Sequence, residues 1–400
     1  MDFTFSDDQQ AISDLAAQIL GDKVTHTSLR QLESAAVDDG RGVGAREPDG
    51  QPAERFAADA WAELARADLL GIPLPAEVGG GGYGVLGAAL VLTEIGRTAA
   101  PVPYLASIVG GAMTVADFGT EAQRETLLPG AIDGTRVFTA ALAEPGVAMV
   151  AEVPQTTALP TGDGRAGWRL DGAKSFVPWL SRAGHGQSPA TRGRVLVPAT
   201  TPDGSVIVVL VDPGADGVTV IDLDLTDGWP ESDLQLDGVA VGAEDVLDGD
   251  GEVISRVMAD RLTAGVCATQ AGVSAAALRL TATYTTERHQ FGSPIATFQA
   301  VAQRAADAYI DTQGIQFTAW QAAWRLDQGL DAADELDIAK FWSAEAGSRV
   351  ADAAQHLHGG IGVDIDYPLH RYYRLTKHLE LTLGGRTERL RRLGARMAAS

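Results

Sequence analysis

Apolar residues in the first third of the chain recur at helical spacing. They occupy one face from Ile12 to Leu20, and the preceding Ser-Asp-Asp-Gln sequence is typical of a helix N-terminus. Residues 35–55 are rich in charge, Gly and Pro and predict a loop. Helical spacing then resumes, interrupted by GIPLPAEVGGGGYG, whose four glycines and two prolines cannot continue a helix. We therefore expect a helical N-terminal domain over residues 1–133.

The period changes in the middle of the chain. Short β-branched runs follow one another, separated by Asp-Gly and Pro-Gly turns, which is the pattern of a β-sandwich or barrel. The sequence predicts an antiparallel β-barrel domain over residues 134–248. Its expected strands are VFTAAL, GWRLDGAKSFV, RVLVPA, SVIVVLVD, GVTVIDL and DLQLDGVAV.

Helical periodicity is then sustained to the end of the chain. Four long segments separated by short loops predict an antiparallel four-helix bundle over residues 249–400, and an α+β fold for the whole chain. The expected helices are 252–288, 297–328, 332–356 and 367–397.

Charge and composition exclude several classes of partner. The formal net charge of −22 argues against binding to nucleic acid or to an anionic membrane, because both need a basic face. Cys267 is the single cysteine, so no disulfide can form within the chain. The first residues lack the basic and apolar blocks of a signal peptide, and no apolar run is long enough to span a bilayer. We expect a cytoplasmic protein.

A histidine-rich stretch, QHLHGGIGVDIDYPLHRYYR, allows three interpretations. His356 and His358 are two residues apart and face different sides of a helix, which disfavours a metal site. Gly359 and Gly360 are typical of a helix C-terminus that turns through positive φ. The same bare backbone could also let a ligand approach closely.

A second motif, ERHQFGSPIATFQAVAQ, follows the end of the first long C-terminal helix. Arg288 precedes an aromatic-Gly turn, Pro294 and a new helix. Arginine often caps the last carbonyls of a helix, so this motif alone is a modest signal.

Together with the α-then-β-then-α order, these motifs give the whole chain a resemblance to the acyl-CoA dehydrogenase flavoproteins. The matching pieces are LLGIPLPAEVGGGGYG, TAALAEPG, the Arg288-His-Gln-Phe-Gly turn and HLHGGIGVDIDYPLHRYYR. The resemblance implies helical first and last regions, a middle β-barrel, and dimers of dimers built around the C-terminal bundle. It also implies FAD bound at a subunit interface.

The resemblance implies a role in cofactor binding for both motifs. In the family, the arginine turn and the helix end before Gly-Gly wrap the diphosphate and adenosine of an FAD whose flavin lies in the neighbouring subunit. Arg288 would pair with the diphosphate, and Arg and Gly suit a phosphate chemically. The other residues carried over are Gln290, Phe291, Gln299, His356, Gly359 and Gly360.

The resemblance fails at the catalytic base. The family removes an α-proton with a carboxylate while flavin N5 takes a hydride from the β-carbon. The commoner base position, counted from the His-Gly-Gly and Tyr-Pro motifs, is Gly384, and the second, counted back from Arg288, is Leu262. Asp260 lies close by, but a shift of two residues turns a helical side chain by about 200°.

Two other family elements are altered. The Thr-Glu-Pro-x-x-Gly-Ser-Asp loop that serves the flavin and CoA becomes LAEPGVAMVAE, which retains Glu144, Pro145 and Gly146 but not the Thr, the second Gly, the Ser or the Asp. The Trp-Ile-Thr strand becomes Ser175–Trp179, with a proline that removes a backbone donor. We interpret these losses as a pocket that this chain does not use.

The resemblance favours a non-catalytic subunit of an α2β2 acyl-CoA dehydrogenase acting on steroid side chains, as in actinobacteria. Such a subunit completes the FAD site of a catalytic partner, which binds the acyl-CoA. Two alternatives stay open. One is a self-sufficient dehydrogenase or oxidase with a relocated base, Asp260 or Glu380, and the other is a flavin-free scaffold that binds proteins.

Overall fold

The computed structural model describes residues 4–35, 55–147, 150–151, 153–162, 167–186, 188 and 190–399. Most of the loop predicted at 35–55 lies outside these residues. The described residues form two compact units, each built from separate stretches of the chain. One unit comprises Met1–Gln31, Val85–Pro101 and Thr263–Ser400, and the other comprises Leu32–Gly84 and Val102–Leu262. The domain boundaries at 133/134 and 248/249 stay a prediction.

The N-terminal region is helical, as predicted. The first helix starts with a capping box, in which Ser6 and Gln9 each bond the other's backbone amide. The elements are α1 (Asp7–Lys23), α2 (His26–Ala35), α3 (Ala58–Arg66), η1 (Ala76–Val78), α4 (Gly84–Thr98), the π-helix η2 (Leu105–Ala112), α5 (Met113–Phe118) and α6 (Glu121–Ile132).

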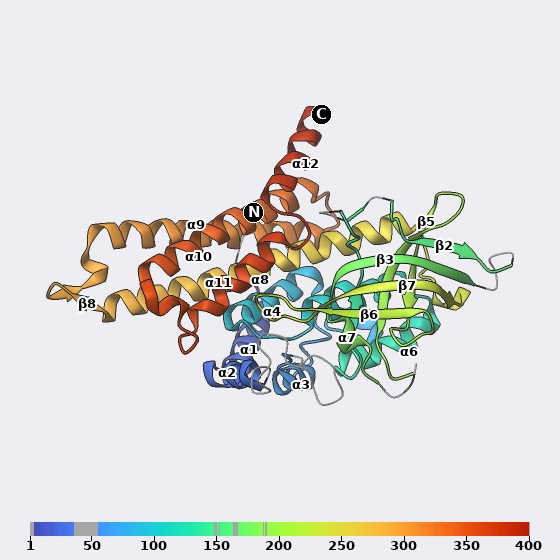
Figure 1. Cartoon of the computed structure of the whole chain (residues 1–400), viewed down its shortest axis with the longest axis horizontal. Helices are drawn as coiled ribbons and strands as arrows, with labels where there is room; N and C mark the ends of the chain where they lie inside the picture. The colour runs from blue at the N-terminus through green and yellow to red at the C-terminus, as the bar shows by residue number, and fades with distance from the viewer. Residues whose placement is uncertain are drawn as a thin grey trace. The chain divides into compact units, whose positions relative to one another are not determined.

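The middle region is a curled, seven-stranded sheet (Figure 1). Each of the six predicted strands is present, and a seventh, β2, was not predicted. The strands are β1 (Phe138–Ala140), β2 (Thr157–Pro160), β3 (Trp168–Pro178), β4 (Arg194–Thr200), β5 (Val206–Val211), β6 (Val218–Leu223) and β7 (Glu231–Val241), with α7 (Leu180–Ala183) after β3 and η3 (Ala243–Asp245) after β7.

Strand pairing refines the expected barrel. The order is β1-β4-β2-β3-β7-β6, with β5 on β4, and no pairing between β5 and β6 closes the described strands into a ring. β1 and β2 both pair with β4 in parallel, whereas the other pairs of this sheet are antiparallel. Long connections to β4 allow the parallel pairs. Val, Leu and Ala side chains from β3, β4, β5 and β7 form the core of this region.

The C-terminal region consists of long helices, and α9, α10 and α11 run alongside one another (Figure 1). Small residues fill the contacts between these helices and α8: Ala271 of α8 packs with Ala346 of α10, and Ala353 of α10 packs with Ala308 of α9. The elements are α8 (Gly251–Glu287), β8 (His289–Gln290), β9 (Ser293–Pro294), η4 (Ile295–Thr297), α9 (Gln299–Asp327), α10 (Ala333–His358), η5 (Gly359–Val363), α11 (Leu369–Leu381) and α12 (Arg386–Ala399).

The last predicted helix, 367–397, is two helices in the structure, and this part of the prediction was wrong. The chain breaks after α11, where Leu383 and Gly384 adopt φ of 58° and 93°. A left-handed pair cannot lie inside an α-helix, so α12 begins in a new direction. Within the described ranges, no helix is both long and apolar enough to cross a membrane.

The backbones of α4 and α8 approach each other closely at two glycines, Gly96 and Gly272. A Cβ on Gly96 of α4 would lie 2.0 Å from the carbonyl oxygen of Thr269, and one on Gly272 of α8 would lie 1.9 Å from that of Thr93. Both distances are far too short for a real contact, so only glycine lets these two backbones meet. The contact joins α4 to the C-terminal bundle within one compact unit.

Candidate cofactor-binding site

The turn after α8 is a two-residue β-hairpin with an aromatic tip. Phe291 and Gly292 lie between β8 and β9 with φ of 53° and 82°, as a type I′ turn requires. Positive φ is uncommon for a bulky side chain and costs about 1–3 kcal/mol. The Phe291 ring is 95 % exposed and meets Phe298 edge-on, at 6.2 Å between centroids. The fold therefore presents an apolar ring to a partner or ligand.

Arg288 lies directly before this hairpin, and its backbone is fixed at both ends. Its amide donates to the carbonyl of Tyr284 at 2.8 Å, and its carbonyl accepts from the amide of Ile295 at 2.8 Å. The side chain is exposed. Among the described residues its guanidinium makes no hydrogen bond or ion pair, so it does not cap the carbonyls of α8. It is a cation available to a ligand.

Two glutamines flank the hairpin. Gln290 is exposed, and its Nε2 donates to the adjacent carbonyl of His289 at 2.8 Å. Gln299 is exposed at the first residue of α9. Both amides can turn towards a bound molecule at little cost, because neither is buried.

The end of α10 forms an open backbone rim. Gly359 adopts φ 63° and ψ −140°, which confirms the predicted turn through positive φ, whereas Gly360 is not left-handed. A Cβ on either glycine would meet nothing within 4 Å, so space lies beside both. Gln355, which sequence reasoning did not single out, donates from Nε2 to the carbonyl of Gly359 at 3.0 Å. His356 is exposed on the last turn.

An aromatic stack brings the two motifs together. The ring of Tyr284, one helical turn before Arg288, stacks on that of His358 at 4.6 Å and 19°. His358 is buried and directly precedes Gly359. The arginine hairpin and the Gly-Gly rim thus lie at the same end of the bundle. In the described residues no three His, Cys, Asp or Glu side chains are arranged to hold a metal ion.

Neither predicted base position carries an acid or base. Gly384 is buried in the left-handed turn between α11 and α12. Leu262 is 8 % exposed and lies against Gly110. Of the two relocated candidates, Asp260 is half-buried on α8, and Glu380 pairs with Lys377 at 3.3 Å.

Glu144, the carboxylate retained in the altered loop, has a structural role. It is buried, and its oxygens accept from Lys174 Nζ at 2.7 Å, from the amide of Gln155 at 2.6 Å, and from the amide and hydroxyl of Thr156 at 3.0 and 2.7 Å. Burial alone would raise the pKa of Glu144, but the ammonium and the two amides hold it below its usual range. This carboxylate stabilises the sheet and is not free to serve a ligand.

The altered strand at the end of β3 is distorted. Phe176 and Trp179 both have positive φ, at 52° and 58°. The register of β3 against β7 shifts between Lys174 and Val177, and Phe176 is 59 % exposed while Trp179 is buried. Pro178 has no amide to donate. The amides of Ser175, Phe176 and Trp179 already donate to Ala143, Asp233 and Pro230, so the segment has few free backbone donors.

Comparison with known proteins agrees with the fold and the motifs. Residues 249–399 match the acyl-CoA dehydrogenase C-terminal domain, and residues 41–135 match the acyl-CoA dehydrogenase N-terminal domain. The acyl-CoA dehydrogenase FadE27 of Mycobacterium tuberculosis is 35% identical over 100% of this chain and 99% of its own. FadE28 of the same organism is 36% identical over 84% of this chain and 91% of its own.

Two solved structures are also similar. The ChsE4-ChsE5 complex from Mycobacterium tuberculosis contains a chain that is 35% identical with a TM-score of 0.86, and both chains are covered in full. The Tcur3481-Tcur3483 steroid ACAD contains one that is 38% identical with a TM-score of 0.84, covering 98% of this chain and 99% of that one. The fold, the two motifs and these matches agree, and the chain belongs to the acyl-CoA dehydrogenase family.

Proposed function

We propose that this chain is the non-catalytic subunit of a hetero-oligomeric FAD-dependent acyl-CoA dehydrogenase. It lacks the catalytic carboxylate and completes the FAD site of a catalytic partner in an α2β2 assembly. The partner would bind the acyl-CoA, and this chain alone would be inactive. Members of the family bind FAD.

The observation that carries the proposal is the pair Arg288 and Phe291. An arginine without a described partner precedes an aromatic residue whose backbone is strained and whose side chain is 95 % exposed, at the end of the bundle. A chain that used these groups only for its own folding would gain nothing from leaving them exposed. A ligand or subunit that covers them accounts for both.

The residues present fit the diphosphate and adenosine of FAD. The guanidinium of Arg288 can donate charge-assisted hydrogen bonds to phosphate oxygens. Gly359 and Gly360 have no Cβ to keep a ligand away, and Phe291 offers an apolar wall. Gln290, Gln299 and His356 would supply polar contacts around the adenosine. When bound, FAD supplies the hydride acceptor of the family reaction.

The base positions support the non-catalytic part of the proposal. Glycine at 384 and leucine at 262 can neither accept nor donate a proton at the reacting carbon. If the partner contributes the carboxylate, this chain needs to supply only the residues that bind the cofactor. Two similar solved structures, ChsE4-ChsE5 and Tcur3481-Tcur3483, each carry the names of two proteins, which favours a pair of unlike subunits here. The second is described as a steroid ACAD. We therefore propose a steroid CoA thioester as the substrate class.

Arg288→Ala in the assembled enzyme tests the proposal. Losing a charge-assisted bond to phosphate at an interface should cost about 2–3 kcal/mol, and so weaken FAD binding roughly 30- to 150-fold. The measurement is FAD titration into the deflavinated complex, followed by flavin absorbance.

Arg66→Ala is the matched control, because Arg66 is an exposed arginine of α3, paired only at the surface with Glu63. It should leave FAD affinity unchanged. Unchanged affinity in Arg288→Ala would remove the cofactor role of Arg288, and a colourless wild-type complex would favour a flavin-free scaffold. Turnover by the purified chain without a partner would favour the alternative of a self-sufficient dehydrogenase or oxidase with a relocated base.

A further inference from the structure

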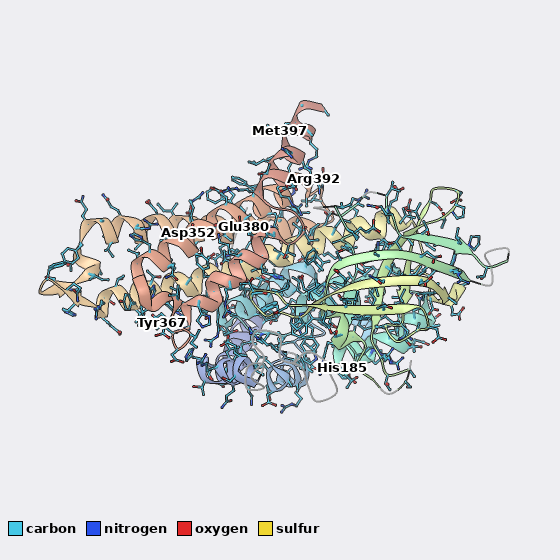
Figure 2. The ribbon with its side chains drawn as sticks, in the orientation of Figure 1. His185, Asp352, Tyr367, Glu380, Arg392 and Met397 are labelled. Carbon is cyan, nitrogen blue, oxygen red and sulfur yellow. The ribbon has the colours of Figure 1, made fainter. Side chains whose placement is uncertain are left out.

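Three rings from three segments meet beneath the Gly359–Gly360 rim. Tyr284 belongs to α8, and His358 is the last residue of α10. Tyr367 lies just before α11 (Figure 2). Tyr284 stacks on His358, and the centroid of Tyr367 lies 5.2 Å from that of His358. His358 is 3 % exposed. The cluster is therefore a buried support for an exposed turn.

Hydrogen bonds fix the tautomer of His358. Its Nδ1 lies 2.8 Å from the carbonyl oxygen of Ala354, which can only accept, so Nδ1 carries the hydrogen. In the neutral ring Nε2 is then an acceptor, and it lies 3.0 Å from the hydroxyl of Tyr367, which donates to it. Protonation would turn Nε2 into a donor, so the bond to Tyr367 would have to reverse, and it would place a positive charge on a ring that is 3 % exposed.

The hydrogen bond between His358 and Tyr367 joins the two ends of the segment 358–367, which contains Gly359 and Gly360. His358 precedes Gly359 directly, and Tyr367 ends the stretch that begins there. Within this stretch Val363 and Ile365 are 67 % and 56 % exposed, so apolar packing contributes little to its position. The His358–Tyr367 bond ties its two ends together.

We propose that His358 and Tyr367 are positioning residues for cofactor binding: their bond holds the Gly359–Gly360 turn open to the FAD diphosphate, and protonation of His358 releases it. This inference rests on the proposed function. Neither side chain needs to touch the cofactor, because each acts through the backbone of the turn.

The direction of the pH effect follows from burial. Burial lowers the pKa of His358 below its ordinary value of 6.5. Protonation would reverse the bond to Tyr367 and leave a buried positive charge. The groups that face the ring are Tyr284 from α8 and Tyr367. The charge of Glu287 acts on Tyr367, and Tyr372 from α11 packs in the same cluster. None of these places a carboxylate on the imidazole in the contacts of the described residues.

A group whose folded pKa is depressed stabilises the fold above its unfolded pKa. Its contribution is lost as the pH falls through the folded value. The turn should therefore be held above about pH 6.5 and released progressively below it. FAD affinity of the assembled enzyme should fall over the same pH range.

The test titrates FAD into the deflavinated complex between about pH 5.5 and 7.5. Tyr367→Phe keeps the ring but removes the donor, and should weaken FAD binding about 2- to 10-fold at the upper pH. His358→Gln removes the titration and should flatten the pH dependence. Tyr373→Phe is the matched control, because Tyr373 loses one hydrogen bond, to Asp352 at the surface, and should bind FAD as the wild type does.

Hydrogen exchange provides a readout independent of FAD. The amides of Asp364 and Tyr367, both bonded within the turn, should exchange faster in Tyr367→Phe while those of α9 do not change. If Arg288→Ala weakens FAD binding but wild-type affinity is independent of pH, or the slope persists in His358→Gln, this inference is wrong and the proposed function stands. If Arg288→Ala has no effect, the proposed function fails, and faster exchange would still show that the bond holds the turn.

Discussion

Two consecutive residues with positive φ, Leu383 and Gly384, set the direction in which the chain leaves α11. Buried cations hold this turn from inside the bundle. Lys340 Nζ donates to the carbonyls of Leu379 and Glu380 at 3.1 and 3.0 Å, and Arg389 donates to the carbonyl of Leu383. Burial lowers the pKa of Lys340 to about 8, so it stays mostly charged at neutral pH. The backbone at the usual base position is therefore fixed in a shape that favours glycine.

Gly384→Glu should fail to create an enzyme and should destabilise the chain. A side chain at φ 93° is strained, which costs about 1–3 kcal/mol. A base also gains nothing without a flavin and thioester positioned beside it. Urea unfolding measures the first effect, and acyl-CoA turnover with an artificial electron acceptor measures the second.

Gly385→Ala is the control for this change. Its added Cβ would lie 3.2 Å from the flexible tip of Glu388 and at an ordinary contact distance of 3.9 Å from the carbonyl oxygen of Glu380, so stability should change little. Turnover in Gly384→Glu without a partner would show that the pocket of this chain is intact.

Sequence reasoning identified Gly384 by counting from the histidine motif, but it could not identify the turn. Apolar spacing is helical on both sides of Thr382–Gly385, so the periodicity alone predicted one continuous helix across the turn. The positive φ of Phe176, Trp179 and Phe291 could not be predicted either, because aromatic residues rarely adopt this conformation. The Glu144–Lys174 pair joins positions thirty residues apart, and no local pattern relates them.

At the scale of elements, α12 is held mainly by charge. Arg389 is the only buried residue of this helix among those described, and its Nη1 lies 2.9 Å from Asp337 of α10. Arg396 reaches the same carboxylate at 2.6 Å, and Arg392 lies 3.6 Å from it. One buried carboxylate thus anchors three arginines of the helix that follows the left-handed turn.

Asp337→Asn should release α12. It leaves Arg389 buried without its anion, and breaking a buried pair in this way costs about 3–5 kcal/mol. Hydrogen exchange of the amides of 386–399 should accelerate, whereas those of α9 should not.

Asp334→Asn is the matched control, since this carboxylate is 55 % exposed and pairs only with Arg396. It should cost at most about 1 kcal/mol. Unchanged exchange in α12 of Asp337→Asn would mean that apolar contacts, and not the buried carboxylate, hold the helix.

Element types were more predictable than their pairing. Alternation and turn residues gave six of the seven strands of the middle sheet, because Asp-Gly and Pro-Gly turns punctuate them. The missed strand, β2, is four residues long and contains Leu159 and Pro160, the first of which is exposed. Its parallel contact with β4 depends on tertiary structure and leaves no periodic signal.

At the scale of the whole molecule, the two compact units interleave along the sequence. Residues 85–101 pack with 263–400, and the Gly96–Gly272 contact shows how closely. A single sequence shows two helical regions and a β region between them, but it does not show which helices share a core. The end of α8 and the end of α10 nevertheless lie together, because Tyr284 stacks on His358, whereas the cofactor role of the residues around them stays a prediction.

The isolated chain should bind little FAD, and co-expression with a catalytic partner should yield a yellow complex with one FAD for each pair of unlike subunits. Arg288 and the Gly359–Gly360 turn would contact only one end of the proposed cofactor, whereas the amides of the segment ending at Trp179 are already bonded within the chain. A site split between chains is incomplete in either chain alone, so affinity should appear only on assembly. Flavin quantitation after size-exclusion chromatography measures this. Stoichiometric FAD in a homo-oligomer would show that the chain completes a flavin site by itself, and a colourless complex with the partner would show that its role is to bind protein alone.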